Sequence, residues 1–220
     1  MDYKQELERI NDKYYNKIKC EYGKYVKNID KIPDMTKKVY IIPLKKCVRE
    51  YEDLQKHTGI CLKKNGRINI REESFNEHLL VHEYIHRISR RFRRKGFKWE
   101  WVEGIDYTDT GICYTGLNEV LTEYLAVRIT GKKMDKHPYQ MFFCLIECLI
   151  KKNGFNYICE NYFQNNGTYF RERIEEIVKY TKYNAYGVIN LIDESLASNK
   201  DDTIAGGADD VKEILKVTHL

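Results

Sequence analysis

The sequence predicts an α+β fold, in which a small β-sheet lies beside helices and a mostly helical part follows. Two observations lead to this prediction. Short runs of strand-forming residues bounded by turn residues fall within residues 39–71. Elsewhere, apolar residues recur at the three- and four-residue spacing of amphipathic helices. The chain has 220 residues, 42% of them hydrophobic, which is enough to bury one real core.

The first part of the chain alternates predicted helices with short strands. Gly23 weakens the end of the first helix, and Pro43 stops the first strand. Asn65-Gly66 is a strong hairpin signal, because asparagine followed by glycine is a sequence typical of two-residue hairpin turns. The expected elements are a helix over 3–28, a strand over 39–42, a helix over 45–56, and hairpin strands over 60–63 and 67–71.

The remaining segments are predicted to be mainly helical. We expect one domain over 1–198, with an N-terminal helix within 1–30 and a helical subdomain over 130–198. Residues 199–220 are expected to form a mobile linker, rich in aspartate and containing Gly206-Gly207, and a short final helix over 209–217. The other expected elements are an extended segment over 99–107, a helix after Gly116, and helices over 138–153, 155–164, 170–180 and 186–196.

The most informative motif is His82-Glu83-Tyr84-Ile85-His86, which reads H-E-x-x-H. Residues four apart share one face of a helix, so the two imidazoles can bind one Zn²⁺ ion. Glu83 is then placed to act as a general base on a metal-bound water. The helix is predicted to continue to Gly96, because Phe92 extends its apolar stripe and basic residues over 87–95 suit a helix C-terminus.

A catalytic zinc ion needs a third protein ligand. The best candidate lies on the predicted helix after Gly116, where Glu119 and Glu123 are four residues apart and share a face. Three acidic residues between the two helices are alternatives, namely Glu103, Asp106 and Asp109. His78 also forms an i, i+4 pair with His82, but we interpret it as a partly exposed residue at the helix start.

With H-E-x-x-H on one helix and Asn118-Glu119-x-x-x-Glu123 on the next, the chain resembles the gluzincin metallopeptidases. The resemblance covers residues 68–128. It implies that His82, His86 and Glu119 are zinc ligands, with one Zn²⁺ per chain, and that Glu83 is the general base. It implies that Glu123 is a carboxylate that orients a ligand histidine.

The resemblance also implies a minimal zincin-like domain, in which a small twisted sheet packs on the metal-binding helix. The edge strand of such a sheet binds a peptide or protein substrate. The expected activity is hydrolysis of a peptide bond by a metal-activated water. The chain has no evident counterpart of the late oxyanion-stabilising residue of larger gluzincins. Its candidates for that role are Tyr107, Tyr114 and Tyr169.

The charge distribution suggests a second class of function. The net charge of +5 is modest, but basic residues concentrate between 87 and 95. The alternative to an enzyme is a helical interaction or nucleic-acid-binding module with a chance H-E-x-x-H motif. A nucleic-acid partner is the less favoured interpretation, because basic residues at a helix C-terminus commonly serve only to solvate that end.

Composition also bears on the compartment. The longest apolar run, residues 141–150, is too short to span a membrane, and the N-terminus does not resemble a signal peptide. The seven cysteines form no C-x-x-C motif and are odd in number, which favours free thiols. We therefore expect a cytoplasmic protein that does not associate with membranes.

Overall fold

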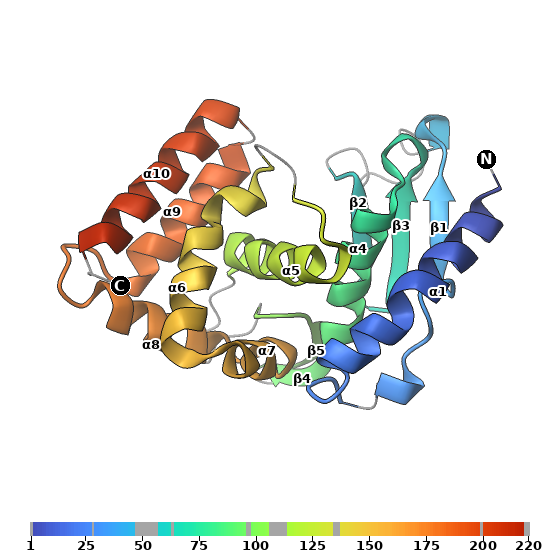
Figure 1. Cartoon of the computed structure of the whole chain (residues 1–220), viewed down its shortest axis with the longest axis horizontal. Coiled ribbons are helices and arrows are strands. Elements are labelled where there is room, and N and C mark those ends of the chain that lie inside the picture. The colour runs from blue at the N-terminus through green and yellow to red at the C-terminus, as the bar shows by residue number, and fades with distance from the viewer. Residues whose placement is uncertain are drawn as a thin grey trace. The chain divides into compact units, whose positions relative to one another are not determined.

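A computed structural model describes residues 2–27, 29–46, 57–62, 64–95, 98–105, 114–133, 137–198 and 200–217. The fold is mainly helical with a small mixed sheet, so the α+β prediction is confirmed (Figure 1). The chain divides into two compact units. The first comprises residues 1–103 and 125–132, and the second comprises residues 104–124 and 133–220. The helical subdomain expected from residue 130 therefore falls mostly within the second unit.

The first unit contains a three-stranded sheet formed by β1 (Val39–Ile42), β2 (Gly59–Leu62) and β3 (Arg67–Arg71). The strand order is β1-β3-β2, with β1 parallel and β2 antiparallel to β3. The predicted strand 39–42 and the predicted hairpin are both confirmed. Gly66 has a φ of 65° at the hairpin turn, a conformation that glycine adopts without strain. The helix predicted over 45–56 lies largely outside the described residues.

Helix α4 (Glu77–Ser89) packs against β2 and β3. The Asn76 side chain caps its N-terminus by accepting a hydrogen bond from the Leu79 amide. Side chains alternate between the two faces of a strand, so Ile68 and Ile70 of β3 lie on the same face of the sheet as Gly59 and Cys61 of β2. Ile68 and Ile70 are both fully buried. The sequence places H-E-x-x-H in this helix, which is buried along almost its whole length.

The predicted continuation of this helix to Gly96 is wrong. Helix α4 ends at Ser89, and the chain forms a two-stranded hairpin of β4 (Arg91–Lys95) and β5 (Lys98–Val102). Phe92 pairs across the hairpin with Trp101, and their ring centroids are 5.3 Å apart. This cross-strand aromatic pair favours the strand over the helix. Strand β5 forms the first part of the segment expected to be extended over 99–107.

Helix α1 (Tyr3–Tyr22) is shorter than the predicted helix over 3–28. Asp2 caps its N-terminus, because the Asp2 carboxylate accepts hydrogen bonds from two backbone amides, and Gly23 caps its C-terminal end. Its buried face contains Ile10, Tyr14, Ile18 and Tyr22. This unit also contains two short 3₁₀ helices, η1 (Ile29–Lys31) and η2 (Glu72–Ser74).

Helix α5 (Thr115–Thr130) contributes residues to both units. In the first unit, the Tyr22 hydroxyl donates a hydrogen bond of 2.9 Å to the Leu125 carbonyl, and Lys17 donates one to the Ile129 carbonyl. In the second unit, the Gly116 amide donates a hydrogen bond to Asp193. Each half of the helix is therefore held by its own set of neighbours.

The rest of the second unit is helical. Its elements are η3 (Tyr139–Phe142), α6 (Phe143–Asn153), α7 (Phe155–Phe163), α8 (Gly167–Val178), α9 (Ala185–Ser198) and α10 (Asp201–Val217). The helices predicted over 138–153, 155–164, 170–180 and 186–196 therefore exist, with shifted ends. Among the described residues, no helix combines the length and the apolar character needed to cross a lipid bilayer.

The segment 199–220 was expected to start with a mobile linker, whereas helix α10 already begins at Asp201. Its apolar residues Ile204, Ala208 and Val211 recur at helical spacing and are buried. A side chain at Gly207 would overlap the Ser195 hydroxyl of α9, so this glycine allows the two helices to approach closely. The aspartates at the start of α10 lie where the helix dipole favours negative charge.

Candidate metal centre

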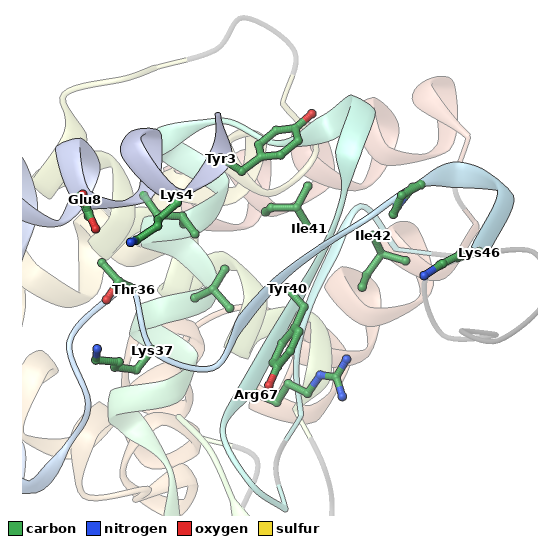
Figure 2. Close-up of a pocket in the computed structure, with 13 residues that line it drawn as sticks. Tyr3, Lys4, Glu8, Thr36, Lys37, Tyr40, Ile41, Ile42, Lys46 and Arg67 are labelled. Atoms are coloured by element: carbon green, nitrogen blue, oxygen red, sulfur yellow. The ribbon is translucent and has the colours of Figure 1, made fainter. Parts of the chain in front are cut away.

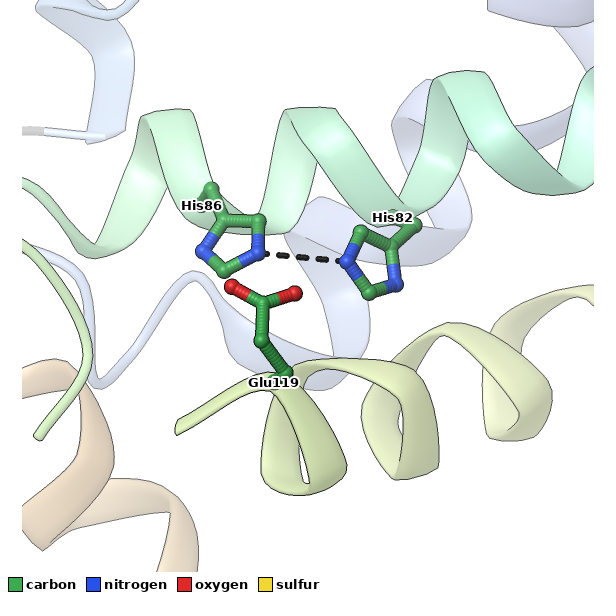
Figure 3. A group of neighbouring side chains, drawn as sticks. All are labelled: His82, His86 and Glu119. Atoms are coloured by element: carbon green, nitrogen blue, oxygen red, sulfur yellow. Dashed lines mark hydrogen bonds between the residues drawn. The ribbon is translucent and has the colours of Figure 1, made fainter. Parts of the chain in front are cut away.

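The two histidines of the motif lie side by side on α4. His82 and His86 are 5% and 4% exposed, and their Nε2 atoms are 3.2 Å apart (Figure 3). The spacing of four residues places both rings on one face of the helix. Packing of α4 against β2 and β3 buries that helix, so both rings are held in a protected environment.

Glu119 completes a group that can hold a metal ion. One ligand atom each from His82, His86 and Glu119 lies within 4.8 Å of the others, and Figure 3 draws the Glu119 carboxylate beside the two rings. Glu119 lies on α5, six residues before Leu125, whose carbonyl is bonded to Tyr22. The chemistry of the group is two imidazole nitrogens and one carboxylate oxygen, a donor set typical of catalytic metal sites.

Glu83 is buried beside strand β2. It is 6% exposed, and its carboxylate occupies the space next to Gly59 of β2. A Cβ atom at Gly59 would lie 2.9 Å from Oε1 of Glu83 and 3.2 Å from its Cγ. The absence of a side chain at Gly59 therefore makes room for the Glu83 carboxylate, which the motif predicts to be a general base.

A second buried carboxylate lies beside His86. Oε1 of Glu103 is 3.5 Å from Nδ1 of His86, the ring nitrogen that does not face His82. The side chain of Glu103 is only 9% exposed. Glu103 was one of three alternatives for the third ligand, but it is not part of the group formed by the two histidines and Glu119. The other two alternatives, Asp106 and Asp109, lie outside the described residues.

The thiol of Cys61 lies in the electrostatic environment of Glu83 and Glu103. Burial raises the pKa of this thiol well above its usual range, and the negative charges of Glu103 and Glu83 raise it further. Cys61 is therefore held as a neutral thiol, beside two carboxylates, on the face of β2 that packs against α4.

Glu123 is almost completely buried in the second unit. It accepts a hydrogen bond of 2.7 Å from the Gln140 side chain, and its Oε1 atom is 3.6 Å from Nδ1 of His137. Its expected role in orienting a ligand histidine stays a prediction. Neither Gln140 nor His137 was identified from the sequence, because nothing in their local pattern indicates a contact with α5.

His78 differs from its sequence interpretation. It is buried rather than partly exposed, and its Nδ1 atom is 2.8 Å from the Thr130 hydroxyl of α5. This hydrogen bond gives His78 a structural role in joining α4 to the end of α5. Sequence spacing alone could not distinguish this histidine from a metal ligand.

The three tyrosines considered for oxyanion stabilisation have different placements. Tyr107 lies outside the described residues. Tyr114 is fully buried directly before α5, and burial raises its pKa to about 12. Tyr169 lies in α8, where the guanidinium of Arg173 is 5.5 Å from its ring centroid. A role for any of them in catalysis stays a prediction.

The basic cluster does not form one solvated helix end. Arg87 is buried, and its guanidinium donates hydrogen bonds to the carbonyls of Gly66, Asp34 and Lys38. The guanidinium of Arg90 instead lies 4.5 Å from the ring centroid of Trp101. The structure therefore uses Arg87 to tie α4 to two loops of the first unit.

A pocket of about 610 Å³ lies between the start of α1 and strand β1 (Figure 2). Its lining combines the apolar residues of β1 with several cations, including Lys4, Lys37 and Arg67. The Arg67 guanidinium is 3.8 Å from the ring centroid of Tyr40, which is itself 45% exposed. None of the residues that line this pocket belongs to the group around His82 and His86.

No protein-family model matches the chain, and no characterised protein or solved structure matches it significantly. A functional assignment therefore depends on the chemistry of the residues described above.

Proposed function

We propose that the chain is a zinc-dependent peptidase, with His82, His86 and Glu119 as the zinc ligands. The observation that carries this proposal is the distance of 3.2 Å between the two Nε2 atoms. Two nitrogens bound to a tetrahedral zinc ion at ordinary bond lengths are about 3.3 Å apart. The separation of the two rings therefore supports the proposal of a shared zinc ion.

The donor set favours zinc over the common hard cations. Mg²⁺ and Ca²⁺ prefer all-oxygen sites, whereas imidazole nitrogens with one carboxylate suit zinc. When bound, zinc supplies a Lewis acid that acidifies water and polarises a carbonyl group. Three protein ligands leave a coordination position open, which is the arrangement of catalytic rather than structural zinc sites.

The chain's own residues supply the remaining chemistry. Glu83 lies next to His82 in sequence and is buried beside β2, so it is the residue proposed to accept a proton from water and deliver it to the leaving amine. Among the described residues, β2 pairs only with β3, which leaves its other edge to receive a peptide as an added strand. The side chain of Glu83 then lies beside the strand that positions the substrate.

Metal binding is tested by zinc analysis of the purified chain. The expected result is one zinc per chain after reconstitution, and His86→Ala should abolish it. Chelator competition should then show a greater loss of affinity for Glu119→Ala than for Glu123→Ala, because only the first removes a bond to the metal. Failure of the reconstituted wild-type chain to retain zinc would remove the basis of the proposal.

Hydrolysis is tested by digesting a diverse peptide library with the zinc-loaded chain and identifying new termini by mass spectrometry. Glu83→Gln keeps the size of the side chain but cannot accept the proton, so it should retain zinc and lose cleavage. General acid–base groups contribute about 10²- to 10⁴-fold to such rates. Equal cleavage by wild type and Glu83→Gln would contradict the proposed role of Glu83.

A nucleic-acid-binding function is the second candidate, and the hairpin of β4 and β5 is the feature that favours it. Phe92 and Trp101 are 53% and 39% exposed on one face of this hairpin, in a sequence rich in arginine. Exposed aromatic rings among cations can stack on single-stranded bases. Fluorescence anisotropy with a labelled oligonucleotide tests it: Trp101→Ala should weaken binding, and no binding at low salt would exclude this function.

A further inference from the structure

We propose that Glu103 is a positioning residue for His86, and that the hairpin of β4 and β5 serves to bring it there. In this role, the Glu103 carboxylate accepts a hydrogen bond from the Nδ1–H group of His86, which directs Nε2 toward the metal. The inference rests on the proposed zinc site, but it assigns to Glu103 a role different from that of a third ligand.

The hairpin register explains how Glu103 reaches His86. Helix α4 ends at Ser89, and β4 begins two residues later. Arg91, the first residue of β4, pairs with Val102, the last residue of β5. The chain thus leaves the end of α4, turns back, and returns Glu103 to the level of the last turn of α4. A shift of one residue in this pairing would turn the Glu103 side chain to the opposite face.

The geometry of the His86 ring separates positioning from ligation. Nε2 of His86 faces Nε2 of His82 at 3.2 Å, whereas Nδ1 faces Oε1 of Glu103 at 3.5 Å. The two nitrogens of an imidazole point in different directions, so a carboxylate at Nδ1 does not share the metal bound at Nε2. The distance of 3.5 Å is longer than an ordinary N–H···O hydrogen bond of about 2.7–3.2 Å, so the proposed bond requires the carboxylate to move closer by a few tenths of an ångström.

Burial should strengthen the interaction between Glu103 and His86. Glu103 and His86 have side chains that are 9% and 4% exposed, so water competes little for either group. A carboxylate that accepts the second ring N–H of a ligand histidine fixes the tautomer and the ring orientation. Loss of such a partner typically weakens metal affinity by about 10- to 100-fold.

The first experiment measures zinc affinity by chelator competition in Glu103→Ala and Glu103→Gln. Glu103→Ala should bind zinc about 10- to 100-fold more weakly, with one zinc still bound at saturation. Glu103→Gln should recover part of this affinity, because its amide oxygen can still accept the N–H. The matched control is Glu100→Ala in β5, three residues before Glu103, which should bind zinc as the wild type does.

Two results of this experiment would overturn the proposal. Affinity in Glu103→Ala within twofold of wild type would mean that the contact does not position His86. Loss of zinc as complete as in His86→Ala would instead make Glu103 a ligand. Circular dichroism of each variant identifies any general loss of fold. If Glu103→Ala is unfolded, the zinc affinity of Glu103→Gln, which keeps the side-chain volume, decides between these results.

The second experiment uses the metal-free chain, so that its outcome does not depend on zinc binding or hydrolysis. Nitrogen-15 NMR at pH 7.5 should show the His86 ring protonated at Nδ1 in wild type and in Glu100→Ala. Glu103→Ala should shift this population toward the other tautomer. An unchanged tautomer in Glu103→Ala would refute the positioning role even if zinc binding and peptidase activity are confirmed.

Discussion

Replacing Gly59 with alanine should displace the proposed general base while leaving the metal ligands in place. The added Cβ would lie 2.9 Å from Oε1 of Glu83, 3.2 Å from its Cγ and 3.2 Å from a methyl carbon of Leu79. Ordinary contacts between such atoms begin at about 3.5 Å, so the Glu83 side chain must move by roughly half an ångström. The change is local, because Gly59 has no positive φ angle that would strain alanine.

The expected effect on stability is small. Glycine within a strand is less favourable than alanine by about 0.5–1 kcal/mol, and this gain offsets part of the cost of the tight contacts. We therefore expect the free energy of unfolding to change by less than about 1 kcal/mol. The effect on hydrolysis should be larger, because a misplacement of 1 Å can lower a rate by about 100-fold. A shift of half that size predicts a loss of roughly tenfold.

The assay compares the zinc content, the urea-denaturation midpoint and the rate of cleavage of a peptide selected with the wild-type chain. Ile60→Val is the matched control, because it alters the neighbouring residue of β2, whose side chain points to the opposite face. Gly59→Ala should keep zinc and stability but lose rate, whereas Ile60→Val should keep all three. A Gly59→Ala variant that cleaves at the wild-type rate would refute the inference that Gly59 makes room for a catalytic carboxylate.

Three further predictions concern the packing that holds α4 and α5. Tyr22→Phe removes the hydrogen bond to the Leu125 carbonyl and should lower the free energy of unfolding in urea by about 1 kcal/mol; no change would mean that this bond contributes nothing to stability. Arg87→Ala removes a buried guanidinium bonded to three carbonyls and should cost about 3 kcal/mol or more by the same measurement, and a loss below 1 kcal/mol would contradict its structural role. The hydrogen bond from Lys132 lowers the pKa of Glu77 from its ordinary 4.5 to about 2. The stability that this carboxylate contributes is therefore present above pH 4.5 and is lost as the pH falls toward 2. Glu77→Gln should flatten the acid side of the stability profile, and an unchanged profile would exclude Glu77 as its source.

Much of the first unit follows from local sequence signals. Pro43 marks the end of β1, and Asn65-Gly66 sets the hairpin of β2 and β3, because these residues restrict the backbone directly. The spacing of His82 and His86 also fixes their shared helical face without any knowledge of tertiary structure. These predictions needed only the residues within one element.

The errors arose where distant residues decide the structure. Phe92 fits a helical stripe, but its pairing with Trp101, nine residues later, places it in a strand. Gly206-Gly207 resembles a linker, yet packing against Ser195 retains it in a helix. The contact of Glu103 with His86 depends on the hairpin register, which local propensity does not encode.

The reactivity of the buried thiol of Cys61 can be used to measure local opening of the proposed site. A thiol must be exposed and ionised to react with an alkylating reagent, and burial suppresses both in Cys61. Labelling of Cys61 in the native state should therefore proceed only when β2 separates from α4, so its rate measures the free energy of that separation. Exposed Cys20 should react at once and serve as the internal reference. Such labelling would measure the local opening of β2 without any substrate. Slower modification after zinc addition would show that the ion stabilises the same region against opening.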